Sequence, residues 1–148
     1  MVEIQLPESP SPQTPQTRQE RIEYGRQVLD AVNGEAGHRV MTALQDVAPA
    51  FGEQVLIGFG EIYARPQLSP RDRQLVTLGM LIALGGCEAQ LEVHVNTSLN
   101  VGLTPEEIVE AMLHSSAYCG FPRALNATFT AKKVFADRGL LPLTGQEI

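Results

Sequence analysis

The sequence predicts an all-α fold, a compact domain of five to six helices. Apolar residues recur at intervals of three and four along most of the chain, which is the spacing of one helix face. Proline, glycine and capping residues interrupt this spacing at the lengths of ordinary helices, and no segment shows the alternation typical of a strand. We expect the domain to span residues 19–148.

Residues 1–18 are expected to form a flexible arm outside this domain. The arm contains four prolines, namely Pro7, Pro10, Pro12 and Pro15. A segment of this composition buries too little apolar surface to offset the entropy that it would lose on ordering.

Glycine and proline delimit the helices of the first half. The first begins at Arg18 and ends near Gly34, and a short one is expected over about 38–47. Pro49 can open the next helix, which the Arg65-Pro66 pair ends, because proline is excluded from a helix interior.

A capped and strongly apolar helix should follow. Ser69 is suited to the cap and Pro70 to the first helical position. The apolar residues between Leu75 and Leu84 cover nearly all sides of this helix, which predicts a central, buried element. Gly85-Gly86 should end it.

Three more helices complete the chain. One should run from about Cys87 to Val101. Thr104 followed by Pro105 and Glu107 is typical of a capping box, which opens a helix that ends at Gly120. The last helix is expected between Pro122 and Gly139.

Composition argues against two classes of partner. The 148 residues carry a formal net charge of −6, whereas binding to nucleic-acid phosphates needs a cationic face. No long apolar or basic amphipathic segment suggests a membrane partner. Without a recognisable secretory signal, the two cysteines are expected to be reduced and the protein to be cytoplasmic.

The densest side-chain chemistry lies in residues 85–127. At about 100° per residue of a helix, Cys87, Gln90 and His94 fall on one side, which is either core or a pocket wall. A lone histidine is more often a buried, hydrogen-bonded imidazole, but its thiol and amide neighbours favour a pocket.

At a helix start the dipole favours a reactive thiolate at Cys87. A small buried hydrophobe is the alternative, and both remain open.

Three further residues of this window could take part in chemistry. His114 and Tyr118 are four residues apart and therefore share a helix face, and Arg123 lies in the first turn of the last helix. His94, His114 and Cys87 lack the short paired spacing of metal ligands, so no metal site is expected.

Three segments resemble the carboxymuconolactone decarboxylase family, whose distant relatives include alkylhydroperoxidase D. They are ERIEYGRQVL (20–29), GEIYARPQLSPRDRQLVTLGMLIALG (60–85) and LEVHVNTSLNVGLTPEEIVEAMLHSSAYCGFPRALNA (91–127). The likeness extends from about Glu20 to Arg138. It implies an all-α fold, a homotrimer or homohexamer, a pocket near His94 and an active site without metal or organic cofactor.

The resemblance also implies a carboxy-lyase that acts on γ-carboxymuconolactone in aromatic-acid breakdown and yields the enol-lactone of 3-oxoadipate. The lactone carbonyl accepts the electrons left by carbon dioxide, so the protein must orient the carboxylate, stabilise the dienolate oxygen and deliver a proton to carbon. His94 is the candidate proton donor or oxyanion partner. The candidates for substrate binding are Gln90, Arg73, His114, Tyr118 and Arg123.

The chain departs from the decarboxylase pattern in three places. Asn96 occupies the position of an arginine that would anchor a dicarboxylate, and Arg123, at a position that is usually small, is our hypothesis for its replacement. The segment GGCEAQ before His94 is usually charged and one residue shorter. Tryptophans common before the Arg-Pro pair are absent from GFGEIYARP.

Two alternatives to the decarboxylase follow from the same residues. The peroxidase branch uses a Cys-x-x-Cys pair and an upstream Glu. Here Cys87 stands at the position of the first cysteine, but Gln90 replaces the second and Gln74 or Leu75 replaces the Glu, so a local dithiol cannot form. A thiol-dependent peroxidase or reductase could then use Cys87, with Cys119 or an external thiol as the resolving group. The other alternative is a catalytically silent, oligomeric binding protein.

Overall fold

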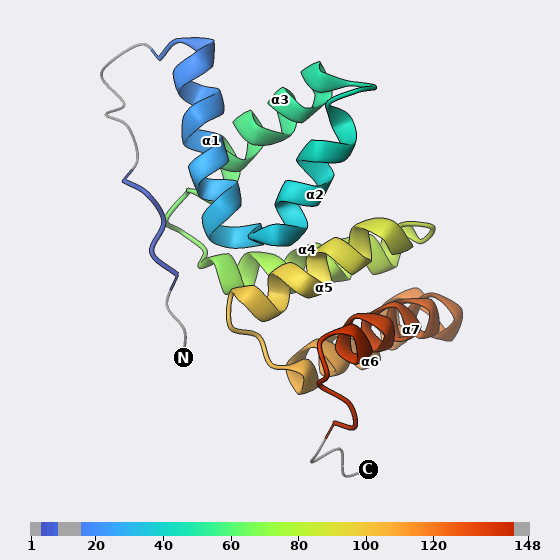
Figure 1. Cartoon of the computed structure of the whole chain (residues 1–148). Helices are drawn as coiled ribbons and strands as arrows, with labels where there is room; N and C mark the ends of the chain where they lie inside the picture. Colours follow the sequence, from blue (N-terminus) through green and yellow to red (C-terminus); the bar gives the residue numbers. More distant parts are fainter. Residues whose placement is uncertain (1–3, 9–15, 144–148) are drawn as a thin grey trace. The chain divides into compact units, whose positions relative to one another are not determined.

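The computed structural model describes residues 4–8 and 16–143, which hold seven α-helices and one π-helical turn (Figure 1). They form two compact units. The first contains α1 (Arg18–Asn33), α2 (Glu35–Leu44), α3 (Pro49–Gly58) and the π turn η1 (Phe59–Tyr63). The second contains α4 (Pro70–Leu84), α5 (Glu88–Asn100), α6 (Pro105–Cys119) and α7 (Phe121–Asp137). The all-α prediction is confirmed. The total of five to six helices was too low, whereas the segments predicted one by one number seven, as in the described residues.

The first unit forms around the packing of α1 against α3. Its core contains Ile22 and Leu29 of α1 together with Leu56 and Ile57 of α3. Gly25 permits the close approach of the two helices, because a Cβ at this position would lie 1.8 Å from the carbonyl oxygen of Leu56. Any larger residue would force the helices apart.

Two elements of this unit differ from the expected helices. α2 starts earlier than predicted, because Gly34 adopts a φ of 52° and a new helix begins directly after it. The third expected helix is α-helical only as far as Gly58 and continues as η1, in which the rings of Phe59 and Tyr63 stack with centroids 4.4 Å apart.

All four helices of the second unit contribute to its core. Fully buried side chains come from every one of them, and they include Leu78 in α4, Val95 in α5, Ile108 in α6 and Phe135 in α7. α6 and α7 lie side by side along most of their length (Figure 1). This packing supports α5, which carries His94.

The predicted capping box at the start of α6 is confirmed. The hydroxyl of Thr104 accepts from the Glu107 backbone N–H at 3.2 Å, and the Glu107 carboxylate accepts from the Thr104 backbone N–H at 2.9 Å. Glu107 also forms an ion pair with Arg71 of α4. The start of α6 is therefore fixed to the start of α4.

The expectation that the helix after Ser69 is buried all round was wrong. In α4 only one side contributes to the core, whereas Val76, Met80 and Leu84 are 51, 55 and 69 % exposed. These three residues follow at every fourth position and so lie along one face. α4 therefore presents an apolar stripe on its surface.

Other expectations are not tested by the described residues. Positions 1–3 and 9–15 of the predicted arm lie outside them, and the division into an arm and a single domain stays a prediction. No helix within 4–8 and 16–143 has the length and apolar character needed to span a bilayer. A cytoplasmic location likewise stays a prediction.

Candidate functional site

Two consecutive glycines connect α4 to α5. Gly85 and Gly86 both have a φ of 69°, in the left-handed region that residues with a Cβ disfavour. Cys87 follows as the N-cap of α5 and is half-buried. Its thiol donates to the carbonyl oxygen of Gly85, at an Sγ–O distance of 3.5 Å. This carbonyl accepts from a thiol but offers no hydrogen bond to a thiolate.

His94, in the middle of α5, meets Gln74 near the start of α4. The imidazole Nδ1 lies 2.9 Å from the amide oxygen Oε1. Because an amide oxygen can only accept, Nδ1 carries the proton and the neutral ring leaves Nε2 with a free lone pair. Gln74 thus determines which ring nitrogen of His94 can exchange a proton with a substrate.

Burial lowers the pKa of His94 from 6.5 to about 4, so the imidazole is neutral at pH 7. The folded protein therefore binds the second imidazole proton, the one that makes His94 positive, less tightly than the unfolded chain does. The contribution of neutral His94 to stability is therefore complete above about pH 6.5 and is lost as the pH falls towards 4. The full loss is about 3 kcal/mol.

Gln74 is fully buried, yet half of its amide is unsatisfied. Oε1 accepts from His94, whereas Nε2 has no hydrogen-bond partner within the described chain. A buried N–H without a partner costs about 1–3 kcal/mol, and rotating the amide would move the deficit to the oxygen. Gln74 and Leu75 are the two residues that could occupy the position of the upstream Glu of the peroxidase branch, and Gln74 is the one that contacts His94.

Cys87 and Gln90 do not join this pair. Neither forms a hydrogen bond with His94 in the part of the chain that the structure describes, and Gln90 is exposed. The prediction of a shared face assumed helical geometry from Cys87 onward. Cys87 instead has the non-helical φ of −115° and ψ of 31° of an N-cap, so helical spacing does not apply to it.

Arg123 is engaged at the end of α4. It donates from Nη1 to the carbonyl oxygen of Ala83 at 2.6 Å, and its side chain lies against Gly85. This carbonyl is one of the last four of α4, which lack partners within the helix and attract a cation through the helix dipole. The replacement of the arginine expected at position 96 by Arg123 stays a hypothesis.

A different arginine lies at Asn96. Arg138, at the end of α7, donates from Nε to Asn96 Oδ1 at 2.8 Å and from Nη2 to Asn100 Oδ1 at 3.2 Å. Both partners are neutral amides, and no carboxylate in residues 4–8 and 16–143 pairs with this guanidinium. No sequence pattern indicated Arg138, because 42 residues separate it from Asn96.

The remaining candidates lie outside the His94–Gln74 pair. The rings of His114 and Tyr118 are 5.2 Å apart on the exposed side of α6, and Tyr118 is 81 % exposed. Arg73 is half-buried and directly precedes Gln74 in α4. Among the substrate-binding candidates, Arg73 is therefore the one nearest to Gln74 along the chain.

The pair of His94 and Gln74 is suited to acid–base chemistry, because it offers a neutral imidazole. Within residues 4–8 and 16–143, no three His, Cys, Asp or Glu side chains gather closely enough to hold a metal ion. That the site uses neither a metal nor an organic cofactor stays a prediction.

Comparison with known proteins gives concordant results. Residues 49–133, which include α4, α5 and the His94–Gln74 pair, match the model of the carboxymuconolactone decarboxylase family. The chain is 35 % identical over 126 residues to the 4-carboxymuconolactone decarboxylase of Acinetobacter baylyi, covering 84 % of this chain and 93 % of that protein. It is also 35 % identical over 104 residues to the nitrosuccinic acid decarboxylase of Metarhizium robertsii, covering 66 and 71 %.

The contact between His94 and Gln74 predicts an unusual titration. In ¹H–¹⁵N spectra that resolve the three histidines, one imidazole should titrate near pH 4, with Nδ1 protonated in its neutral form, and His94→Gln should remove it. Gln74→Glu should raise the pKa of His94, because a carboxylate favours the imidazolium. A His94 resonance that titrates near 6.5 in the unaltered protein would contradict the buried environment.

Proposed function

Because this chain belongs to the carboxymuconolactone decarboxylase family, we propose that it decarboxylates an unsaturated lactone carboxylic acid, as in breakdown of aromatic acids through 3-oxoadipate. Both relatives are named as decarboxylases, which supports a carboxy-lyase. The observation that carries the proposal is the buried, neutral His94 with Nδ1–H held by Gln74 and Nε2 left for substrate.

The compounds in the relatives' names share one chemical property. Carboxymuconolactone and nitrosuccinic acid each lose a carboxylate whose bonding electrons can be delocalised onto oxygen, in a lactone carbonyl or a nitro group. Such a substrate supplies its own electron sink, so the protein needs only to orient the carboxylate, stabilise negative charge on oxygen and protonate carbon. We infer that the substrate of this chain has the same property.

His94 is the residue that we assign to proton transfer. When carbon dioxide leaves, the C–C bonding pair forms the dienolate, and a proton must be added to carbon, so each turnover consumes one proton. Neutral His94 does not hold that proton in the free protein at pH 7. An anionic substrate nearby favours the imidazolium, so we propose that His94 binds a proton at Nε2 together with substrate and then delivers it to carbon.

Gln74 and Arg73 complete the proposed site on α4. Gln74 fixes the orientation of His94 through its amide oxygen. Arg73 is our candidate for binding a carboxylate. Cys87 has no assigned step in this reaction, because its thiol is directed to a backbone carbonyl.

Variants of two residues separate the decarboxylase from the thiol peroxidase. We expect γ-carboxymuconolactone turnover, followed by its ultraviolet absorbance, to fall at least about 100-fold in His94→Gln, because acid–base residues contribute roughly 10²–10⁴-fold. Cys87→Ser should retain turnover, and both variants should keep the melting temperature above the assay temperature. Peroxide turnover with a dithiol that depends on Cys87 would contradict the proposal, as would an inactive unaltered protein.

The pH dependence tests whether His94 acts as an acid. If free His94 must gain a proton, kcat/KM should rise about tenfold for each unit that the pH falls from 7 to 5, since kcat/KM reports the free enzyme, whose His94 has a pKa of about 4. A profile that is flat between pH 5 and 7 would assign the neutral imidazole to catalysis and overturn the acid role.

We also propose that the chain self-associates, as the family resemblance implies. Phe121, Leu125 and Phe129 occur at every fourth residue of α7 and are 69, 48 and 63 % exposed. Together with the stripe on α4, they give the second unit two apolar faces on its surface. Soluble monomers seldom expose such patches, so these faces are the candidates for contact between copies.

Negative charges introduced on the apolar face of α7 test this contact. Leu125→Glu combined with Phe129→Glu should shift the molar mass in light scattering from a trimer or hexamer towards the monomer, because two carboxylates would be buried unpaired. Arg39→Glu in α2 is the control, since it changes the net charge by the same two units at an exposed position of the first unit. A monomeric unaltered protein, or unchanged mass in the double variant, would contradict α7 as the interface.

A further inference from the structure

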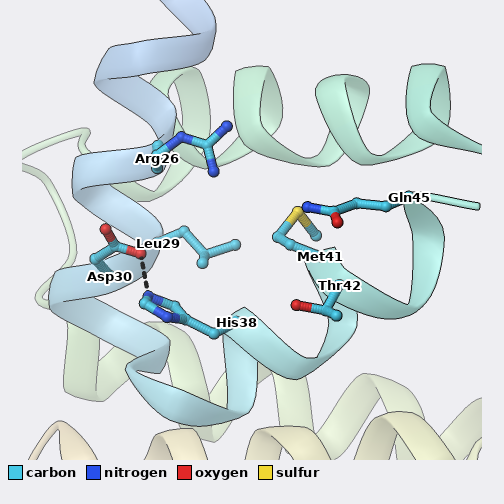
Figure 2. Close-up of a pocket in the computed structure, with 7 residues that line it drawn as sticks. All are labelled: Arg26, Leu29, Asp30, His38, Met41, Thr42 and Gln45. Carbon is cyan, nitrogen blue, oxygen red and sulfur yellow. Dashed lines mark hydrogen bonds and ion pairs between the residues drawn. The ribbon is translucent and has the colours of Figure 1, made fainter.

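A small pocket lies between α1 and α2, in the first unit, and none of the proposed catalytic residues belongs to it (Figure 2). Its volume is about 150 Å³. α1 contributes three of its lining residues, and α2 with its C-cap contributes the other four. The lining residues are Arg26, Leu29, Asp30, His38, Met41, Thr42 and Gln45.

The apolar part of the pocket belongs to the core of the first unit. Leu29 is 2 % exposed and packs with Leu56 and Ile57, and Met41 packs against the same cluster. These side chains are held by the contact of α1 with α3. The pocket thus has an apolar surface that is fixed before any ligand arrives.

A hydrogen bond between the two helices closes one side. His38 Nε2 lies 2.7 Å from Asp30 Oδ1 (Figure 2). A carboxylate oxygen can only accept, so Nε2 carries a proton whatever the charge of the ring. The bond holds the His38 ring against α1 and occupies one of the two oxygens of Asp30.

The polar groups on the other sides are available to a ligand. The guanidinium of Arg26 has only a 3.9 Å ion pair with Glu23 among the described residues. The side chains of Thr42 and Gln45 make no hydrogen bond in the same part of the chain. In Figure 2, Arg26, Thr42 and Gln45 lie around the ends of Leu29 and Met41, so exposed polar side chains surround an apolar centre.

We propose that this pocket binds a small monocarboxylic acid. The carboxylate is bound by the planar donors of Arg26, which match its two oxygens, and the hydrocarbon part lies on Leu29 and Met41. The volume is below the roughly 300 Å³ at which pockets for drug-sized ligands begin, so nucleotides and other large anions are too big. Because Leu29 is also a core residue, an occupied pocket stabilises the first unit by mass action.

The test is a ¹H–¹⁵N NMR titration of the whole protein with sodium butanoate, at constant ionic strength maintained with sodium chloride. We expect saturable shifts concentrated at the backbone amides of α1 and α2. Butanamide, which has the same shape without the charge, should bind at least about tenfold more weakly, since a hydrogen bond to a charged group contributes about 1.5–3 kcal/mol. Arg26→Gln should weaken butanoate binding by a similar factor.

Two control variants make the result specific. Arg39→Gln removes an exposed arginine of α2 that does not line the pocket, and it should leave butanoate binding within about twofold. His94→Gln should also leave it unchanged, which separates this pocket from the proposed active site. Shifts that map to α5, equal binding of butanamide, or unchanged affinity in Arg26→Gln would each overturn the proposal.

Discussion

The Gly85-Gly86 turn is the constraint on which the candidate site depends. Two successive residues with positive φ connect α4 to α5, and the resulting register allows His94 to meet Gln74. Arg123 fastens the same turn from α7 through the carbonyl of Ala83. A substitution at Gly85 would therefore act on the site from a distance, because a side chain there meets both an unfavourable φ and the Arg123 side chain at 3.2 Å.

The same turn places His94 in surroundings that keep its imidazole neutral. It brings His94 against a fully buried amide instead of a carboxylate, and burial then dominates the pKa. A glutamate at position 74 would favour the protonated form of His94 even when no substrate is bound. With glutamine, charge on His94 depends on an anion that arrives from outside. In the proposed mechanism, the identity of this one side chain therefore couples proton uptake to substrate binding.

Local signals predicted the fold, and long-range contacts account for what the sequence did not reveal. The start of α6 follows from the Thr104–Glu107 capping box, because all the atoms involved lie within one turn. His94 was likewise selected as a candidate from its neighbours in the sequence. The contact between Arg138 and Asn96 depends on the packing of α7 on α5, and no periodicity encodes it. Ideal helical spacing failed at Cys87, because an N-cap does not share the helix backbone.

Burial is unevenly distributed over the candidate residues, and this links chemistry to assembly. His94 and Gln74 are shielded well enough to move the pKa of the imidazole to about 4, whereas Gln90, His114 and Tyr118 are exposed. Loss of carbon dioxide from an anion is favoured when its carboxylate leaves water, so the active site must exclude water from the bound substrate. The apolar faces of α4 and α7 are where we propose that a second copy binds. A second copy bound there would bury apolar area and could also enclose the exposed candidates, in which case self-association would be a condition of catalysis rather than an addition to it.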